Sequence, residues 1–117
     1  MGAWPIELRV DPERTTLTVA YDNGDRFSLP AEYLRVESPS AEVQGHGPSQ
    51  KKTVAGKRRV KIEQVEPVGN YAARIRFDDG HDTGLYSWDY LHELGREKER
   101  KWSEYLSALR RTGGKRE

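Results

Sequence analysis

One histidine among three carboxylates is the best candidate for chemistry in this sequence. Residues 77–82 read Phe-Asp-Asp-Gly-His-Asp, so His81 is close in sequence to Asp79 and Asp82. Imidazole and carboxylate groups bind divalent metal ions, and a hydrolytic metal site with His81 and Asp82 as ligands can be drawn from these residue types. The competing interpretation is a hairpin turn, because Asp-Asp-Gly is typical of turns whose carboxylates accept hydrogen bonds from backbone N–H groups. We favour the turn.

A second histidine lies between two glycines, in residues 45–48, which read Gly-His-Gly-Pro. Flanking glycines would let the backbone approach a ligand closely, although an isolated histidine of this kind is also typical of a loop. The stretch lacks the Gly-Lys-Ser/Thr that completes a phosphate-binding loop. One hypothesis is therefore that His46 and His81, with Asp79 or Asp82, bind iron or another divalent ion weakly.

The absence of cysteine excludes several kinds of chemistry. No disulfide, thiolate nucleophile, cysteine-ligated zinc or cysteine-ligated iron–sulfur cluster can form within this chain. No nucleophile, base and orienting acid can be assigned with any specificity either. We therefore predict that the chain is not an enzyme and holds no cofactor.

The charge pattern gives little reason to expect a nucleic-acid or membrane partner. The formal net charge is +1, although basic residues concentrate in residues 51–59 and 96–116. Phosphate backbones bind such clusters, but glutamates are interspersed along the second one and predict i,i+4 ion pairs on a solvated helix face. Binding of nucleic acid through the basic C-terminal helix is a remote alternative. The apolar runs are only a few residues long, so we expect no membrane segment and a cytoplasmic location.

Alternation of apolar and polar residues predicts the strands. They are expected over residues 6–10, 15–21, 26–29, 60–65 and 71–77, with a short strand at 82–85. Asn-Gly at 23–24 and Asp-Gly at 79–80 predict hairpin turns, and residues 67–70 predict another turn. The faces expected to be buried carry Ile6, Leu8 and Val10 in the first strand and Tyr71, Ala73, Ile75 and Phe77 in the fifth.

Helical spacing of apolar residues begins after Ser87, a candidate helix cap. It predicts two helices, about 88–94 and 96–110, or one helix kinked near Gly95. Residues 30–35 predict a single helical turn, and residues 37–58 form a long loop without periodicity, which is usually functional or disordered. The order predicts an α+β fold, a small antiparallel β-meander sheet packed with the C-terminal helix. Residues 1–110 form one domain, and residues 111–117 a disordered basic tail.

Two segments resemble a known family. The first is residues 29–43 (Leu-Pro-Ala-Glu-Tyr-Leu-Arg-Val-Glu-Ser-Pro-Ser-Ala-Glu-Val) with Gly-His-Gly at 45–47. The second is Asn-Tyr at 70–71, Phe-Asp-Asp-Gly-His-Asp-Thr-Gly at 77–84 and Tyr-Ser-Trp-Asp-Tyr-Leu at 86–91. Together they resemble the gamma-butyrobetaine hydroxylase-like N-terminal domain family in its stand-alone bacterial form, over roughly residues 6 to 95.

The resemblance implies a zinc site that this chain has lost. In the carnitine-pathway dioxygenases of that family, three cysteines and a later histidine form a Cys3His zinc site. The cysteine positions fall on Ser38, Ser40 and Val43, and the histidine on His81. Serine hydroxyls are poor zinc ligands and valine has no donor, so we predict no structural zinc. The iron and 2-oxoglutarate site of those enzymes belongs to a separate domain that is not in this sequence.

The leading hypothesis is a non-enzymatic module that docks on an unknown protein partner. Related domains are also attached to P-loop ATPases that resemble iron–sulfur cluster carriers, which suggests by analogy a link to iron–sulfur or metal metabolism. Because the loop and the hairpin meet in the zinc-bearing relatives, we expect them to be neighbours and to form the docking surface. That surface would contain Gly45, His46, Gly47, Asp79, His81 and Asp82.

Overall fold

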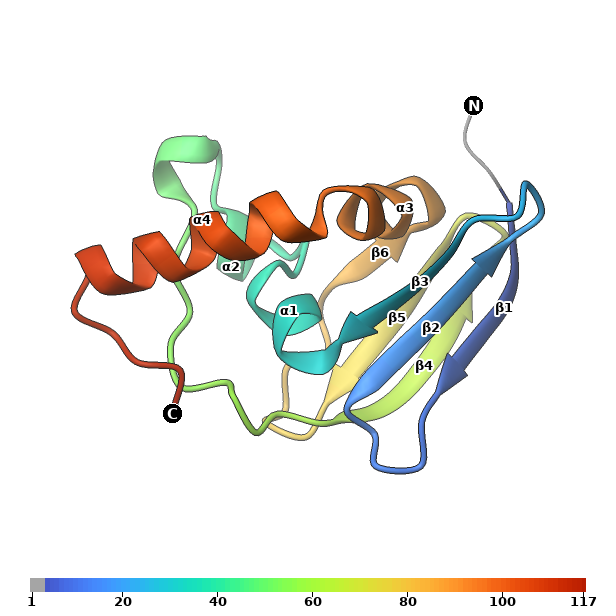
Figure 1. Ribbon diagram of the computed structural model, residues 1–117, viewed down its shortest axis with the longest axis horizontal. Helices are drawn as coiled ribbons and strands as arrows, with labels where there is room; N and C mark the ends of the chain where they lie inside the picture. Colours follow the sequence, from blue (N-terminus) through green and yellow to red (C-terminus); the bar gives the residue numbers. More distant parts are fainter. Residues whose placement is uncertain (1–3) are drawn as a thin grey trace.

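Six strands form two separate three-stranded antiparallel sheets (Figure 1). The structure, a computed structural model, describes residues 4–117. The first sheet contains β1 (Pro5–Val10), β2 (Thr16–Tyr21) and β3 (Arg26–Pro30), and the second contains β4 (Ile62–Val68), β5 (Ala72–Phe77) and β6 (Leu85–Ser87). Each sheet is a meander with its strands in chain order. The predicted α+β fold is confirmed, with the strands divided between two meanders rather than joined in one.

The first sheet follows the predicted alternation except at its beginning. Leu17, Val19 and Tyr21 of β2 are buried on one face, as expected. Ile6, however, is 70% exposed, so the prediction that it shares the buried face of β1 is wrong. The pairing of β1 with β2 is irregular between Pro5 and Glu7, and such an irregularity changes the face on which the following side chains lie.

The strands of the second sheet begin and end at residues that differ from the predicted ones. Strand β4 extends to Val68, so the predicted turn at 67–70 is confined to Gly69 and Asn70, and Pro67 pairs with Ala73 of β5. A proline is tolerated there because β4 is an edge strand, where one backbone N–H can be missing. Strand β5 begins at Ala72, so Tyr71 precedes it and is 55% exposed instead of joining the buried face. Strand β6 spans Leu85–Ser87, so it overlaps the expected stretch 82–85 only at Leu85.

Two C-terminal helices cover the sheets, α3 (Trp88–Arg96) and α4 (Lys98–Arg111). The Ser87 hydroxyl caps α3 by accepting a hydrogen bond from the Tyr90 N–H at 3.0 Å. The two helices separate at Glu97 rather than at Gly95. Gly95 lies inside α3, where a Cβ would come within 2.3 Å of the Phe27 ring, so the glycine permits close packing of α3 on β3.

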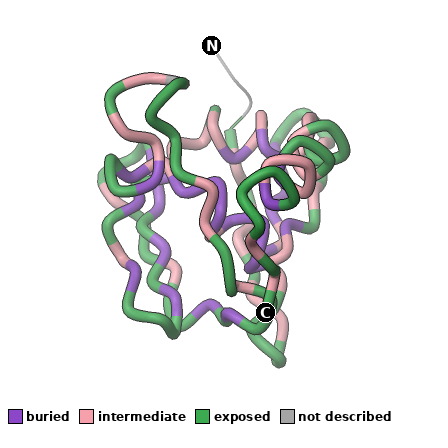
Figure 2. The backbone as a smooth tube through the Cα atoms, turned by 90° about the vertical axis from the view of Figure 1, so that its left-hand side faces the viewer, coloured by how far each residue is buried: buried purple, intermediate pink, exposed green. Residues whose placement is uncertain are grey.

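The main core lies between the two sheets, α1 (Ala31–Val36) and α3. Buried segments alternate with exposed ones along the chain (Figure 2). Tyrosines are the largest fully buried side chains, and their hydroxyls reach backbone carbonyls: Tyr33 donates to Leu94 O at 2.7 Å and Tyr86 to Leu34 O at 2.6 Å. Each bond links α1 to another element, so burial of these rings leaves no phenol without a partner.

The long loop is placed by contacts with its surroundings. It contains α2 (Ala41–Gln44) and a 3-10 turn (Pro48–Gln50). The carboxylate of Glu37 is buried and accepts from Lys51 Nζ at 2.7 Å, while the Tyr105 hydroxyl donates to Val54 O at 2.6 Å. These bonds fasten the loop to α1 and α4.

The C-terminal segment, expected to be disordered, has defined partners. The N–H groups of Gly56 and Arg58 donate to the carbonyls of Lys115 and Arg116, each at 2.8 Å. The Arg116 guanidinium makes a two-pronged contact with the buried Glu32 carboxylate at 2.8 and 3.0 Å. In Figure 1 the C-terminus accordingly lies beside the loop. No helix among residues 4–117 is long and apolar enough to cross a membrane.

Candidate functional site

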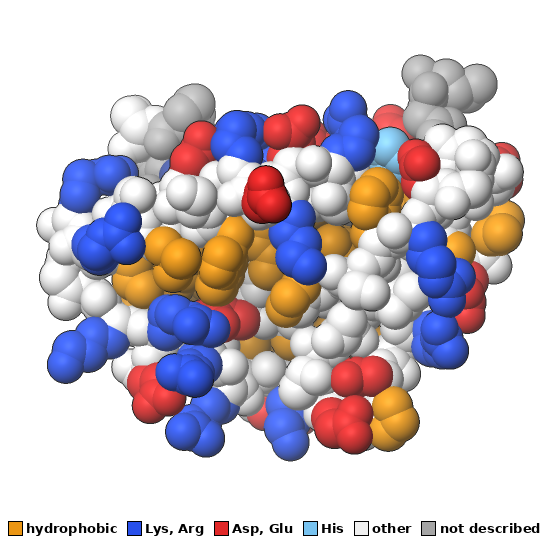
Figure 3. Space-filling view, in the orientation of Figure 1, with side chains coloured by type: hydrophobic (Ala, Val, Ile, Leu, Met, Phe, Trp, Pro, Cys, Tyr) orange, Lys and Arg blue, Asp and Glu red, His pale blue; other side chains and the backbone are white. Residues whose placement is uncertain are grey.

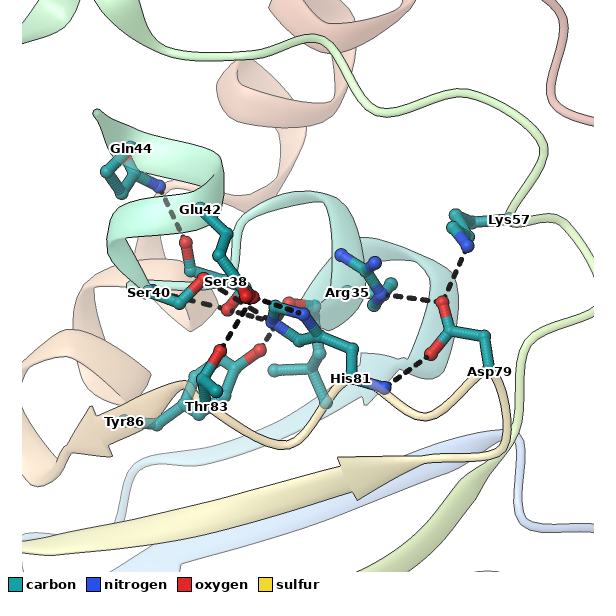
Figure 4. A network of polar contacts seen from close by, with 11 residues as sticks. Arg35, Ser38, Ser40, Glu42, Gln44, Lys57, Asp79, His81, Thr83 and Tyr86 are labelled. Carbon is teal, nitrogen blue, oxygen red and sulfur yellow. Dashed lines mark hydrogen bonds and ion pairs between the residues drawn. The ribbon is translucent and has the colours of Figure 1, made fainter.

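Two segments that are far apart in the sequence meet at His81 (Figure 4). Ser38 follows α1, Ser40 immediately precedes α2, and His81 lies in the connection between β5 and β6. The His81 Nε2 atom is 2.8 Å from the Ser38 Oγ and 3.5 Å from the Ser40 Oγ. Three of the four positions that the zinc resemblance singles out are therefore in contact.

The other ring nitrogen of His81 faces a carboxylate. Its Nδ1 is 3.3 Å from Oε1 of Glu42, and the same oxygen accepts a hydrogen bond from the Thr83 hydroxyl at 2.8 Å. A neutral imidazole has one donor and one acceptor nitrogen. A proton on Nδ1 therefore suits both sides of the ring: Nε2 accepts from the Ser38 hydroxyl, and the protonated Nδ1 faces the Glu42 carboxylate.

Burial keeps this imidazole neutral. The side chain of His81 is only 6% exposed. Burial lowers the pKa of His81, and the nearby Arg35 guanidinium lowers it further, while Glu42, Asp79 and Asp82 act in the opposite direction. We call Ser38, Ser40, Glu42, His81 and Thr83 the His81 clasp, because they join the beginning of the long loop to the second sheet.

Asp79 organises the turn that carries His81. Its Oδ1 accepts from the His81 N–H at 3.1 Å, and Oδ2 contacts Arg35 Nε at 2.9 Å and Lys57 Nζ at 2.6 Å. Burial opposes ionisation of this carboxyl, but hydrogen bonds from Lys57, the His81 backbone and Arg35 outweigh it and lower the pKa of Asp79 to about 2. Gly80 adopts a φ of +91°, which glycine tolerates. The interpretation of this segment as a turn is confirmed.

The donors of the clasp do not fit a Cys3His zinc site. Ser38 and Ser40 offer neutral hydroxyls that contact the imidazole, and Val43, buried on α2, has no donor atom. His81 supplies the remaining donor, and its two nitrogens already have partners. Among residues 4–117, no group of three or more His, Cys, Asp or Glu side chains could hold a metal ion.

Gly84 packs closely against the Ser38 side of the clasp. A Cβ on Gly84 would lie 2.6 Å from the Ser38 Oγ and 3.2 Å from the Tyr86 ring. Both Ser38 and Tyr86 are fully buried. The backbone at Gly84 therefore packs closely against Ser38, and only a glycine fits at this position of the clasp.

The two parts of the predicted docking surface, residues 45–47 and residues 79–82, make no direct hydrogen bond or ion pair with each other in residues 4–117, and the surface stays a prediction. His46 is exposed, and its backbone N–H donates to Gln50 Oε1 at 3.0 Å. Gly45 ends α2 with a φ of +66°, and a Cβ there would lie 2.6 Å from Gln50.

The outcome for the six predicted surface residues is mixed. His46 is exposed and Gly47 and Asp82 are half-buried, whereas the His81 ring is enclosed and Asp79 is held by cations. The prediction that the His81 side chain forms part of an accessible surface is therefore wrong, because the ring is 6% exposed and its nitrogens contact Ser38, Ser40 and Glu42.

Sequence reasoning missed four residues of the site. Glu42 and Thr83 complete the clasp, and Arg35 and Lys57 hold Asp79. Each of the four contacts a residue more than 20 positions away in the chain. Charged residues occur throughout this sequence, so nothing in their local spacing distinguished these four.

Comparisons with known proteins agree with the resemblance. The sequence model described as "Gamma-butyrobetaine hydroxylase-like, N-terminal" matches residues 8–92. No curated protein matches this chain.

Solved structures extend the similarity to nearly the whole chain. Two proteins solved by NMR are 46% and 43% identical, each with a TM-score of 0.84; the alignments cover 98% of this chain and 90% and 86% of theirs. A crystal structure from Acidithiobacillus ferrooxidans, of a DUF971-family protein of unknown function, is 36% identical with a TM-score of 0.65, covering 78% of this chain and 91% of that one.

Proposed function

We propose, from the premise that this chain belongs to the gamma-butyrobetaine hydroxylase-like N-terminal family, that it is a non-enzymatic interaction module. In this proposal the His81 clasp is structural. It holds the long loop in one conformation on the second sheet, where related zinc-bearing domains would use metal–ligand bonds. The module then offers a rigid surface to a protein partner.

The observation that carries this proposal is the state of His81. A catalytic base or a metal ligand needs a nitrogen lone pair that a substrate or ion can reach. Here the side chain is 6% exposed, Nε2 contacts Ser38 and Nδ1 contacts Glu42. The Asp79 carboxylate, which accepts from the His81 backbone N–H, is bound by Arg35 and Lys57. These contacts support a structural role better than a chemical one.

A link to iron–sulfur or metal metabolism would operate through the partner. The chain has no cysteine, so it would contribute docking rather than cluster ligands. Weak binding of a divalent ion by His46 and His81 together is not favoured, because no contact within residues 4–117 joins the two side chains.

A metal titration tests the structural role of the clasp. The wild-type chain and a Ser38→Cys/Ser40→Cys/Val43→Cys variant are each titrated with Zn²⁺, Fe²⁺ and Co²⁺ while the imidazole resonances are followed by NMR. We expect no shift of the His81 resonances of the wild type at micromolar metal. The variant should bind Zn²⁺ and develop the absorption bands of thiolate-bound Co²⁺. Saturable shifts of His81 in the wild type would contradict the proposal and support the metal-binding alternative.

A second measurement tests the interaction module. The chain, tagged at its native locus, is followed by size-exclusion chromatography of a gentle lysate. We expect elution as a complex larger than the 13.4 kDa chain, with a defined partner at fixed stoichiometry. Elution of the whole population as free chain, before and after chemical cross-linking in the cell, would contradict an interaction role.

A further inference from the structure

Most cations of the C-terminal helices fall into two groups. One group is neutralised within the chain: Arg100 contacts Glu97 and Glu104, and Lys101 Nζ is 3.2 Å from Glu93. The cations of these helices that are exposed and form no ion pair with any residue in 4–117 are Arg96, Lys98, Arg110 and Arg111; the first three form the second group, and Arg111 lies outside it. The predicted ion pairs thus occur on one side of α4 and leave the other side positively charged.

The second group surrounds an apolar groove on α4. The groove has a volume of about 670 Å³. Half-buried Trp102 and Leu106 form its apolar part. The remaining lining residues are Gly95, Arg96, Lys98, Glu99, Ser103 and Arg110. Figure 3 shows hydrophobic side chains reaching the surface on the face that carries α4, with Lys and Arg side chains on either side of them.

The apolar floor is held rigidly from behind. The Trp102 ring meets Tyr33 edge-on at 6.2 Å and Tyr105 at 5.1 Å, and the Arg116 guanidinium lies 5.5 Å from its centre. Arg116 is fixed in turn by Glu32. An immobilised aromatic side chain that keeps one part exposed is a favourable anchor for binding, because little side-chain entropy is lost on association.

We propose that this α4 groove binds an acidic segment of a partner protein. Apolar side chains of the segment contact Trp102 and Leu106, and its carboxylates face Arg96, Lys98 and Arg110. Charge complementarity identifies the occupant: three cations without an ion-pair partner in residues 4–117 and one carboxylate, Glu99, line the groove. Lys98 Nζ and Arg110 donate hydrogen bonds to the neutral oxygens of Ser28 and Ser107, so their charges are not neutralised. The proposal rests on the interaction role proposed above and adds the place and the chemistry of the contact.

A peptide suits this groove better than a nucleic acid. Phosphate backbones are bound by continuous rows of cations, and single-stranded bases need an open aromatic face for stacking. Here Glu99 lies among the cations and Trp102 is half-buried beneath them. A mixed apolar and cationic lining is instead suited to an acidic segment with hydrophobic anchors.

Peptide selection on the isotopically labelled chain tests the proposal. A display library of random 12-residue peptides is selected against the wild type, and the enriched peptides are titrated into ¹⁵N-labelled protein. A 20-base-pair DNA duplex and a single-stranded RNA are titrated in parallel. We expect enriched peptides that combine Asp or Glu with aromatic or aliphatic residues. Their binding should shift the amides of residues 95–110 and weaken with added salt.

Charge reversal provides the matched comparison. The Arg96→Glu/Arg110→Glu variant should lose about ten-fold or more in affinity for the acidic peptides. Arg111→Glu, also on α4 and exposed but outside the groove, serves as the control and should retain affinity within about two-fold. All three substituted side chains are exposed, so the variants should fold, which circular dichroism checks.

Any of the other outcomes would contradict the proposal that the α4 groove binds acidic peptides. Those outcomes are enriched peptides that are neutral or basic, amide shifts centred outside residues 95–110, equal losses of affinity in both variants, tighter binding of DNA or RNA, and no enrichment of any peptide. Peptides that bind elsewhere on the chain would refute the groove while leaving the interaction role intact. Failure of the interaction role itself is read separately, from the free chain in the cell lysate.

Discussion

Removal of the Ser38 hydroxyl is the most direct test of the His81 clasp. Ser38 is fully buried, and its Oγ is 2.8 Å from His81 Nε2 and 3.3 Å from the Ser40 N–H. The Ser38→Ala variant leaves a buried imidazole acceptor and a backbone donor without this partner. Leaving a buried polar group unsatisfied costs about 1–3 kcal/mol. A chain of this size loses about 4 °C of Tm per kcal/mol, so we expect Tm to fall by about 4–12 °C.

Urea denaturation followed by tryptophan fluorescence measures this loss. Ser38→Ala, His81→Leu and the double variant complete a thermodynamic cycle, which isolates the interaction of the two side chains. We expect a coupling free energy of about 1 kcal/mol, the usual net contribution of such a hydrogen bond. Ser103→Ala, at an exposed position of α4, should change stability by less than about 0.5 kcal/mol and serves as the control.

Two results would refute the reasoning. A Ser38→Ala variant as stable as the Ser103→Ala control would show that the hydroxyl satisfies no buried group. A coupling energy of zero would show that Ser38 and His81 act independently despite their 2.8 Å separation. Hydrogen exchange adds a local readout: amides of residues 41–44 should exchange faster in Ser38→Ala if the clasp holds the loop.

Three further predictions concern the same region. Gly84→Ala should destabilise the fold by about 1–3 kcal/mol in urea, because its Cβ would lie 2.6 Å from the Ser38 Oγ; a stability equal to wild type would contradict this close packing. Because the pKa of His81 is lowered from 6.5, the unfolded chain binds more protons than the folded chain below pH 6.5, so the free energy of unfolding should fall as the pH drops from there. The His81→Gln variant should weaken this pH dependence of stability, whereas His46→Gln should keep it. Equal pH dependence in both variants would refute the attribution to His81. Asp79→Asn should cost about 1–2 kcal/mol of stability at pH 7, because the carboxylate binds two cations near the surface. This loss should disappear between pH 3.8 and about 2, where acid protonates the wild-type Asp79. A stability difference that persists at low pH would show that the Asp79 charge is not its cause.

The strands and hairpin turns could be predicted where local patterns are strong. Leu17, Val19 and Tyr21 alternate with polar residues and form the buried face of β2. Asn23-Gly24 and the turn before His81 combine residues that tolerate a positive φ, and both turns occur as expected. These features depend on interactions within a few residues, which a sequence pattern contains directly.

Positions that depend on distant contacts were predicted less well. Gly95 was expected to interrupt a helix, but it lies inside α3. A glycine is needed there because a Cβ would overlap the Phe27 ring of β3. Residues 111–117 were expected to be disordered, yet Arg116 reaches the buried Glu32, 84 positions earlier. Composition describes the polarity of such segments, whereas their order depends on which partners the fold places beside them.

The sequence by itself determined which atoms are present at the former zinc positions. With no cysteine, hydroxyls at 38 and 40 and a valine at 43, thiolate ligands are excluded whatever the fold. Only the tertiary structure decided that Ser38 and His81 form a buried pair with the exposed Glu42 carboxylate beside it, and that His81 is enclosed rather than offered to a partner. The reason is physical: donor atoms belong to individual residues, whereas burial, pKa and accessibility arise from packing between segments that are some 40 residues apart in the chain.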